Sequence, residues 1–159
     1  MIRRKETVRK MFSILLVSHG ALAHAMEESA QMVQGPCGAV HTMEIMPDMS
    51  VESIEQNLRD TLRELQSEGD TVVLSDIPLG TPFNVLLRLM REMEFLHITG
   101  ANLPLFLELR ALCKSGAPLT AVQEMLIPEA RKKMFSVNDF CESLRHAEQG
   151  TKGEKKANV

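Results

Sequence analysis

The 159-residue chain has no tryptophan, no tyrosine and only six phenylalanines, so aliphatic side chains and eleven methionines must fill most of its core. Its three cysteines, Cys37, Cys113 and Cys141, lie far apart and form no CxxC pair. This usage favours a reducing compartment and argues against a disulfide framework or a metal site of the usual spacing. No apolar run approaches the length of a membrane span, and we expect a cytoplasmic protein.

Basic residues are concentrated at the start of the chain. Residues 1–10 contain five basic side chains and one acidic one, a formal charge of +4, so the net charge of -3 leaves -7 for the remainder. A nucleic-acid-binding surface needs lysine and arginine clustered on the folded body, so we exclude that class of protein. We expect residues 1–10 to be a basic arm or to precede a start at Met11, residues 11–149 to form one domain, and residues 150–159 to be a mobile polar tail.

The most informative stretch is residues 12–20, Phe-Ser-Ile-Leu-Leu-Val-Ser-His-Gly. An apolar run of this length, ended by a turn signal, is typical of a strand buried on both faces, although a buried helical segment has the same pattern. In a parallel sheet, His19 would then face the crevice where ligands bind. A single histidine beside a strand is also often only a hydrogen-bonded structural residue, so this stretch alone leaves both interpretations open.

Apolar segments of strand type alternate with segments of helical periodicity along the chain. The predicted strands are residues 12–20, 38–46, 71–76 and 95–100, and helical patterns follow them at residues 22–33, 54–65, 82–93 and 103–113. Such alternation predicts right-handed βαβ units, a parallel sheet and helices on both of its faces.

The first predicted helix and the helix caps can be read in more detail. The apolar face expected for the first helix consists of Leu22, Ala25, Met26, Ser29, Met32 and Val33. Ser50 is expected to cap the second helix, and Thr81 the third, with Pro82 as its first residue.

The C-terminal part of the chain has weaker signals. Apolar spacing predicts a helix from Leu119, which Pro128 should end or kink. Residues 133–138 have the composition of a short strand, and residues 139–148 that of a final helical segment.

Two of the predicted strands end in ionisable residues, His19 and Asp76. If these strands are neighbours, the carboxylate fixes the tautomer of the imidazole and leaves its far nitrogen free as a nucleophile or base. The turn of residues 79–84 leads into a helix N-terminus, whose free amides and dipole suit an anion, and the Thr81 hydroxyl adds a donor. Together these features indicate phosphoryl transfer through a phosphohistidine.

Three motifs make the prediction more specific: Ile-Leu-Leu-Val-Ser-His-Gly at residues 14–20, Asp76 followed by Gly-Thr-Pro-Phe-Asn at 80–84, and Thr-Gly-Ala-Asn-Leu-Pro at 99–104. In this order and spacing, residues 11–139 resemble the enzyme IIA component of the mannose family of the bacterial phosphoenolpyruvate-dependent sugar phosphotransferase system.

The resemblance implies a role for each site residue. His19 would accept a phosphoryl group from the histidine-containing phosphocarrier protein and pass it to a IIB component, for sugar uptake and phosphorylation. Asp76 would hold the imidazole. A phosphate-binding role is implied for Gly20, Gly80, Thr81 and Phe83. No metal or other cofactor is expected.

The resemblance also implies the fold, a doubly wound α/β structure with a mainly parallel four-stranded sheet and helices on both faces. A short C-terminal antiparallel strand, assigned to residues 133–138, would be exchanged between the subunits of a homodimer. The chain departs from the family pattern at two places. Many members have two glycines where this chain has Leu79-Gly80, and Pro128 lies within a segment that the family keeps as one helix.

Other interpretations use the same residues. The chain could be the phosphotransfer subunit of a dihydroxyacetone kinase, a regulatory or sensor domain of the same fold, or a small-ligand-binding domain without turnover. The remaining histidines, His24, His41, His97 and His146, lack the spacing of a metal site and are interpreted as structural or solvated.

Overall fold

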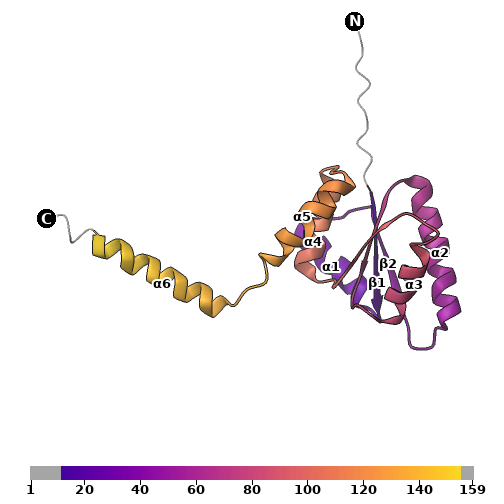
Figure 1. Ribbon diagram of the computed structural model, residues 1–159, viewed down its shortest axis with the longest axis horizontal. Helices are drawn as coiled ribbons and strands as arrows, with labels where there is room; N and C mark the ends of the chain where they lie inside the picture. The colour runs from indigo at the N-terminus through magenta and orange to yellow at the C-terminus, as the bar shows by residue number, and fades with distance from the viewer. Residues whose placement is uncertain (1–11, 155–159) are drawn as a thin grey trace, which may run out of the picture.

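The computed structural model describes the backbone of residues 12–154 and the side chains of residues 12–147. Its centre is a four-stranded parallel sheet with the order β2-β1-β3-β4 (Figure 1). The strands are β1 (Ser13–His19), β2 (Val40–Ile45), β3 (Thr71–Ser75) and β4 (Leu96–Thr99). All four strands that the sequence predicts are therefore present, and the apolar run before His19 is a strand.

Helices cover both faces of the sheet, which confirms the doubly wound arrangement. The covering helices are α1 (Leu22–Gln34), α2 (Val51–Glu68), α3 (Thr81–Leu89), α4 (Leu103–Lys114) and α5 (Leu119–Arg131), and α6 (Val137–Glu154) follows them in the chain. In Figure 1, α1, α4 and α5 lie on one side of the strands, and α2 and α3 lie on the other.

Strand β1 contributes to a core on each face because its side chains alternate. Ile14 and Leu16 pack with residues of α1, α4 and α5, whereas Leu15 and Val17 pack with residues of α2 and α3. All four side chains are at most 1% exposed. A strand buried on both faces holds its last residue, His19, at a fixed place on the edge of the sheet.

The predicted Ser50 cap is confirmed, and a second side-chain cap, from Asn102, begins α4. The Ser53 amide donates to the Ser50 hydroxyl at 3.1 Å, and the Leu105 amide donates to the Asn102 side chain at 3.0 Å. The predicted Thr81 cap is wrong. Gly80 is the residue that precedes α3, and Thr81 is the first residue within the helix.

The predicted buried face of α1 is also wrong in most of its residues. Leu22, Met32 and Val33 are 45%, 89% and 65% exposed, and the buried residues are Ala23, Met26, Glu27 and Ala30. The small side chains of Ala23 and Ala30 let the helix lie close to the sheet. Glu27 is buried because its carboxylate lies 3.7 Å from the guanidinium of Arg110, which is itself fully buried.

The C-terminal elements differ from the prediction in two ways. Of the two effects predicted for Pro128, an end to the helix is wrong, because α5 continues past this proline to Arg131. The strand predicted at residues 133–138 is wrong, because residues 133–136 form a connection and α6 begins at Val137. The Asp139 amide donates to the Ser136 hydroxyl at 3.3 Å, which favours this helix start.

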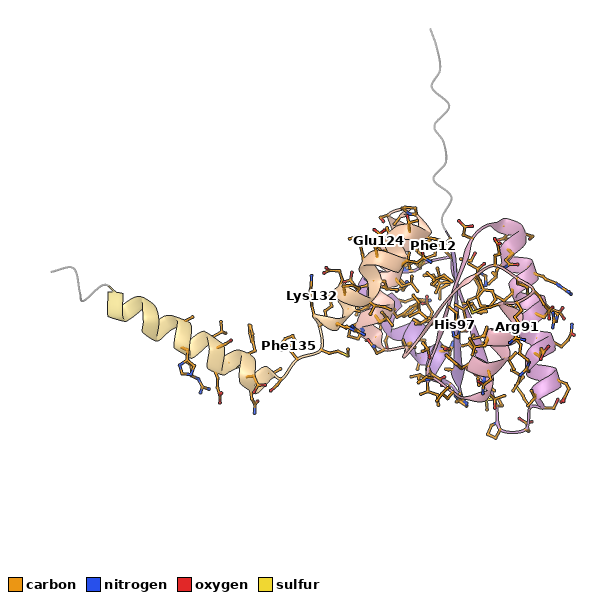
Figure 2. All side chains as sticks on the ribbon, in the orientation of Figure 1. Phe12, Arg91, His97, Glu124, Lys132 and Phe135 are labelled. Carbon is orange, nitrogen blue, oxygen red and sulfur yellow. The ribbon has the colours of Figure 1, made fainter. Side chains whose placement is uncertain are left out.

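Helix α6 extends away from the body of the molecule (Figure 1), and Phe135 lies just before it, outside the body (Figure 2). The helix runs to Glu154, four residues past the predicted start of the polar tail. Residues 1–10, expected to be a basic arm, and residues 155–159 of the tail lie outside the described residues. No helix between residues 12 and 154 is both long enough and apolar enough to span a membrane.

Candidate functional site

The candidate site lies at the carboxyl edge of the sheet, between β1 and β3. His19 is the last residue of β1, and Asp76 follows directly after β3. In the sheet, β2 lies on one side of β1 and β3 lies on its other side. His19 and Asp76 therefore lie at the point where the strand order reverses. Open parallel sheets bind their ligands at this point.

One oxygen of Asp76 holds both the backbone and the ring of His19. Asp76 Oδ2 accepts the His19 amide at 2.8 Å and lies 2.8 Å from His19 Nδ1. An ionised carboxylate only accepts hydrogen bonds, so Nδ1 carries the proton and Nε2 keeps its lone pair. The Asp76 side chain is 9% exposed and that of His19 is 46% exposed, which leaves the ring open to an incoming group.

The ionised state of Asp76 follows from its contacts. Burial of the carboxyl acts to raise its pKa, but hydrogen bonds from the His19 amide, the His19 ring and the Ile77 amide outweigh burial. The pKa of Asp76 is therefore lowered, and the carboxylate is the form present at neutral pH.

A tight turn follows His19 and joins β1 to α1. Gly20 has a φ of +55°, and its amide donates to the Ile45 carbonyl at 3.0 Å. The Ala23 amide donates to the Ser18 hydroxyl at 2.7 Å, which joins the end of β1 to the start of α1. The sequence reasoning missed Ser18, although a serine shortly before a helix is a recognisable capping signal. Because the Gly20 amide already donates to Ile45, it is not a free donor for a phosphoryl oxygen. The role of Gly20 is to allow the turn.

The N-terminus of α3 faces the ring of His19. The first hydrogen bond within this helix is donated by Asn84 to the Gly80 carbonyl at 3.0 Å, so the amides of Thr81 and Phe83 precede it. A Cβ added to Gly80 would lie 3.1 Å from His19 Cε1 and 3.6 Å from Nε2. A side chain at residue 80 would therefore push the ring a few tenths of an ångström away from the helix start.

A cavity of about 490 Å³ lies beside the imidazole, and His19, Gly20 and Thr81 all line it. The rest of its lining is apolar and comes from the end of β2 to the first turn of α2: Ile45, Met46, Pro47, Met49, Val51 and Ile54. A second cavity, of about 580 Å³, lies at the opposite edge of the sheet and contains none of the candidate residues.

Phe83 contacts a different part of the molecule. Its ring packs against the ring of His97 with the centroids 5.4 Å apart, and His97 Nε2 lies 2.9 Å from the Ser75 hydroxyl. His97 lies within the body of the molecule (Figure 2), and burial lowers its pKa. These contacts tie α3 to β3 and β4. The Phe83 ring is therefore engaged within the body of the molecule, and a phosphate contact of this residue would have to come from its backbone amide.

The remaining histidines and the cysteines lie outside the site. The ring of His24 is 3.5 Å from Glu28 on the exposed side of α1, and His41 and His146 are exposed. All three cysteines are free. Within the described residues, no group of three or more histidine, cysteine or acidic side chains has the arrangement of a metal site.

Comparison with known proteins places the chain in a family. Residues 13–126 match the model of the family described as PTS system fructose IIA component, where PTS denotes the phosphotransferase system. The chain is 23% identical over 146 residues to the PTS system fructose-specific EIIA component of Bacillus subtilis, an alignment that covers 91% of this chain and 99% of the relative. It is 26% identical over 96 residues to the sorbose-specific EIIA component of Lacticaseibacillus casei, covering 60% and 69% of the two chains.

A solved structure supports the same assignment. The crystal structure of the PTS IIA protein associated with the fucose utilization operon of Streptococcus pneumoniae superposes with a TM-score of 0.73 and 28% identity, covering 82% of this chain and 98% of that one. The family model matches well over half of the chain, and the resemblance to mannose-family IIA components is confirmed. The chain therefore belongs to the family of IIA components of the sugar phosphotransferase system.

Proposed function

We propose that the protein is a phosphocarrier that accepts a phosphoryl group on His19 and passes it to a second protein. The contact that carries this proposal is the 2.8 Å pair between Asp76 Oδ2 and His19 Nδ1, because it leaves Nε2 as an exposed nucleophile. The donor is the histidine-containing phosphocarrier protein, and the acceptor is a IIB component that serves sugar uptake and phosphorylation.

The transfer step needs no proton movement at His19. The Nε2 lone pair attacks phosphorus, the new N–P bond forms, and the bond between phosphorus and the donor nitrogen breaks, with the electron pair returning to the donor ring. The phosphorylated His19 ring is then a cation that retains its Nδ1 proton. The Asp76 carboxylate stabilises this cation through the hydrogen bond it already makes.

The start of α3 supplies hydrogen-bond donors for the phosphoryl oxygens. The amides of Thr81 and Phe83 and the Thr81 hydroxyl are the proposed donors, and the positive end of the helix dipole adds to them. Phosphoryl transfer depends mainly on in-line positioning and on stabilisation of these oxygens, which preorganised backbone donors supply. Gly80 leaves space beside the imidazole because it has no Cβ, and Gly20 allows the turn after His19 through its positive φ.

The names of the relatives favour sugar uptake over the other interpretations. The curated relatives are named as fructose-specific and sorbose-specific EIIA components, so we propose a role in sugar transport in place of a dihydroxyacetone kinase subunit. His19 and Asp76 are both present and in contact, which favours a working carrier over a regulatory domain that only senses phosphorylation.

We also propose that the protein acts in the cytoplasm as a homodimer. Val137, Phe140 and Leu144 of α6 are 63%, 50% and 49% exposed and recur at helical spacing on one face. A solvated helix of this kind gains stability from a partner surface. Light scattering on the full chain should give twice the monomer mass, and Phe140→Asp should shift it toward the monomer. A monomeric wild type would contradict the dimer.

The carrier role is tested by intact mass after incubation with phosphoenolpyruvate, enzyme I and the histidine-containing phosphocarrier protein. The wild type should gain one acid-labile phosphoryl group, and His19→Ala should gain none. His24→Ala is the matched control, because His24 is an exposed histidine on the neighbouring helix, and it should be phosphorylated like the wild type. Failure of the wild type to gain mass, with both upstream proteins active, would contradict the proposal.

A further inference from the structure

Leu79 has a backbone conformation that its side chain disfavours. Among the residues that the structure describes, it is the non-glycine residue with a positive φ, at +63°. The left-handed region is disfavoured for L-residues with a Cβ atom, and glycine adopts it readily. Such outliers persist where the surroundings require them, and they are common at functional sites.

Contacts within the chain do not account for this side chain. Leu79 is 80% exposed, so it gains little from burial in the protein itself. A glycine at this position would keep the loop and remove both the unfavourable conformation and the exposed apolar surface. Burial within the chain therefore gives no reason for leucine in place of glycine at this position.

The position of Leu79 indicates what it contacts. The loop 76–80 connects Asp76, which holds the imidazole, to Gly80, which lies against the ring of His19. Ile77 in this loop is 53% exposed, and beyond the imidazole Met46 and Val51 are 46% and 45% exposed on the cavity wall. We call Ile77, Leu79, Met46 and Val51 the apolar rim of the site.

The apolar rim does not suit a small phosphorylated molecule. No lysine or arginine is present among the described residues that line the cavity beside His19, and the nearest charged group on the loop is the acidic Asp76. A free phosphate ester is a dianion that is usually bound by cationic side chains. An apolar surface that surrounds an exposed reactive group fits the apolar contact surface of a protein.

We propose that Leu79 is a docking contact for the protein that donates the phosphoryl group to His19. The occupant of the apolar rim is the histidine-containing phosphocarrier protein, with its phosphorylated histidine turned toward His19. The inference rests on the proposed function, because the donor must bring its phosphorylated nitrogen to His19 and so must cover the neighbouring loop. Leu79 acts in recognition of the donor and takes no part in the transfer of the phosphoryl group.

Kinetics with two donors test this role. Leu79→Ala and Leu79→Gly are compared with the wild type, using the phosphorylated histidine-containing phosphocarrier protein as one donor and phosphoramidate as the other. We expect both variants to raise KM for the protein donor about tenfold, the effect of losing an interface contact worth about 1.4 kcal/mol. The kcat with the protein donor and the rate with phosphoramidate should change by less than about twofold.

Met32→Ala is the matched control, because Met32 is an apolar side chain with 89% exposure near the far end of α1, and it should leave both reactions unchanged. An unchanged KM for the protein donor in both Leu79 variants would overturn the inference. So would an equal loss with both donors, because the side chain would then act on the His19 site itself. If neither donor phosphorylates the wild type, the proposed function fails together with the inference.

Discussion

A single carboxylate oxygen, Asp76 Oδ2, lies 2.8 Å from the backbone nitrogen of His19 and 2.8 Å from its ring nitrogen Nδ1. The two contacts fix the end of β1 and the direction of the imidazole together. Nε2 is consequently the ring nitrogen that is free for chemistry.

The first prediction concerns Asp76→Asn. The amide keeps the size of the side chain but loses the negative charge that stabilises the phosphorylated, cationic ring. We expect kcat for phosphorylation of His19 to fall about 10- to 100-fold, the usual effect of removing the partner that orients a functional histidine. Stopped-flow or quench measurements of the phosphoprotein would give this rate. Asp60→Asn, on the exposed side of α2, should react like the wild type, and an undiminished rate in Asp76→Asn would contradict the role of the carboxylate.

Gly80→Ala is the second prediction. The added Cβ would lie 3.1 Å from His19 Cε1, so the ring must move away from the start of α3. A displacement of this kind should lower the phosphorylation rate by about 10- to 100-fold because the transfer needs in-line geometry. Gly38→Ala is the control, since a Cβ there meets nothing within 4 Å. Equal rates for the two variants would mean that the helix start does not support the reacting ring.

The third prediction concerns stability at Leu79. Alanine retains the unfavourable left-handed conformation, which glycine tolerates, so Leu79→Gly should be more stable than Leu79→Ala by about 1 kcal/mol. Urea unfolding of both variants measures the difference. Identical unfolding free energies would show that the loop does not keep the φ of +63° in solution.

The fourth prediction concerns the pH dependence of stability at His97. Burial lowers the pKa of this histidine from its ordinary value of 6.5, so the folded protein binds a proton there less readily than the unfolded chain does. The free energy of unfolding should therefore fall as the pH drops below about 6.5, because only the unfolded chain gains the proton in that range. In His97→Asn this part of the decline should be absent. Parallel pH profiles for the two proteins would contradict the prediction.

The site residues His19 and Asp76 show what the sequence could predict. The run of residues 12–20 and the β-branched segment before Asp76 are strong strand signals, and parallel strands bring their carboxyl ends to one edge. The meeting of His19 and Asp76 therefore followed from local patterns and from the rules of α/β topology. The motif at residues 80–84 likewise predicted that Thr81 lies near His19, and both residues line one cavity. Thr81 is, however, the first residue of α3 and not its cap.

Some of the features that were missed depend on contacts between distant segments, and others depend on local backbone geometry that the residue pattern does not specify. The buried face of α1 includes the charged residue Glu27, whose partner Arg110 is 83 residues away, and apolar spacing does not contain that information. Residues 133–138 have a strand-like composition, but the local cap from Ser136 begins a helix instead. The pair formed by Ser75 and His97, and the positive φ of Leu79, likewise become visible only once the chain is folded.

The measurement that tests the central claim most directly is the identity of the phosphorylated nitrogen. Nuclear magnetic resonance of the protein labelled with ¹⁵N in histidine, recorded after phosphorylation, distinguishes an Nε2–P bond from an Nδ1–P bond. Because Asp76 holds Nδ1, the account predicts a single phosphorylated residue, His19, modified at Nε2 and still protonated at Nδ1. Phosphorylation at Nδ1, or on any other residue, would contradict it.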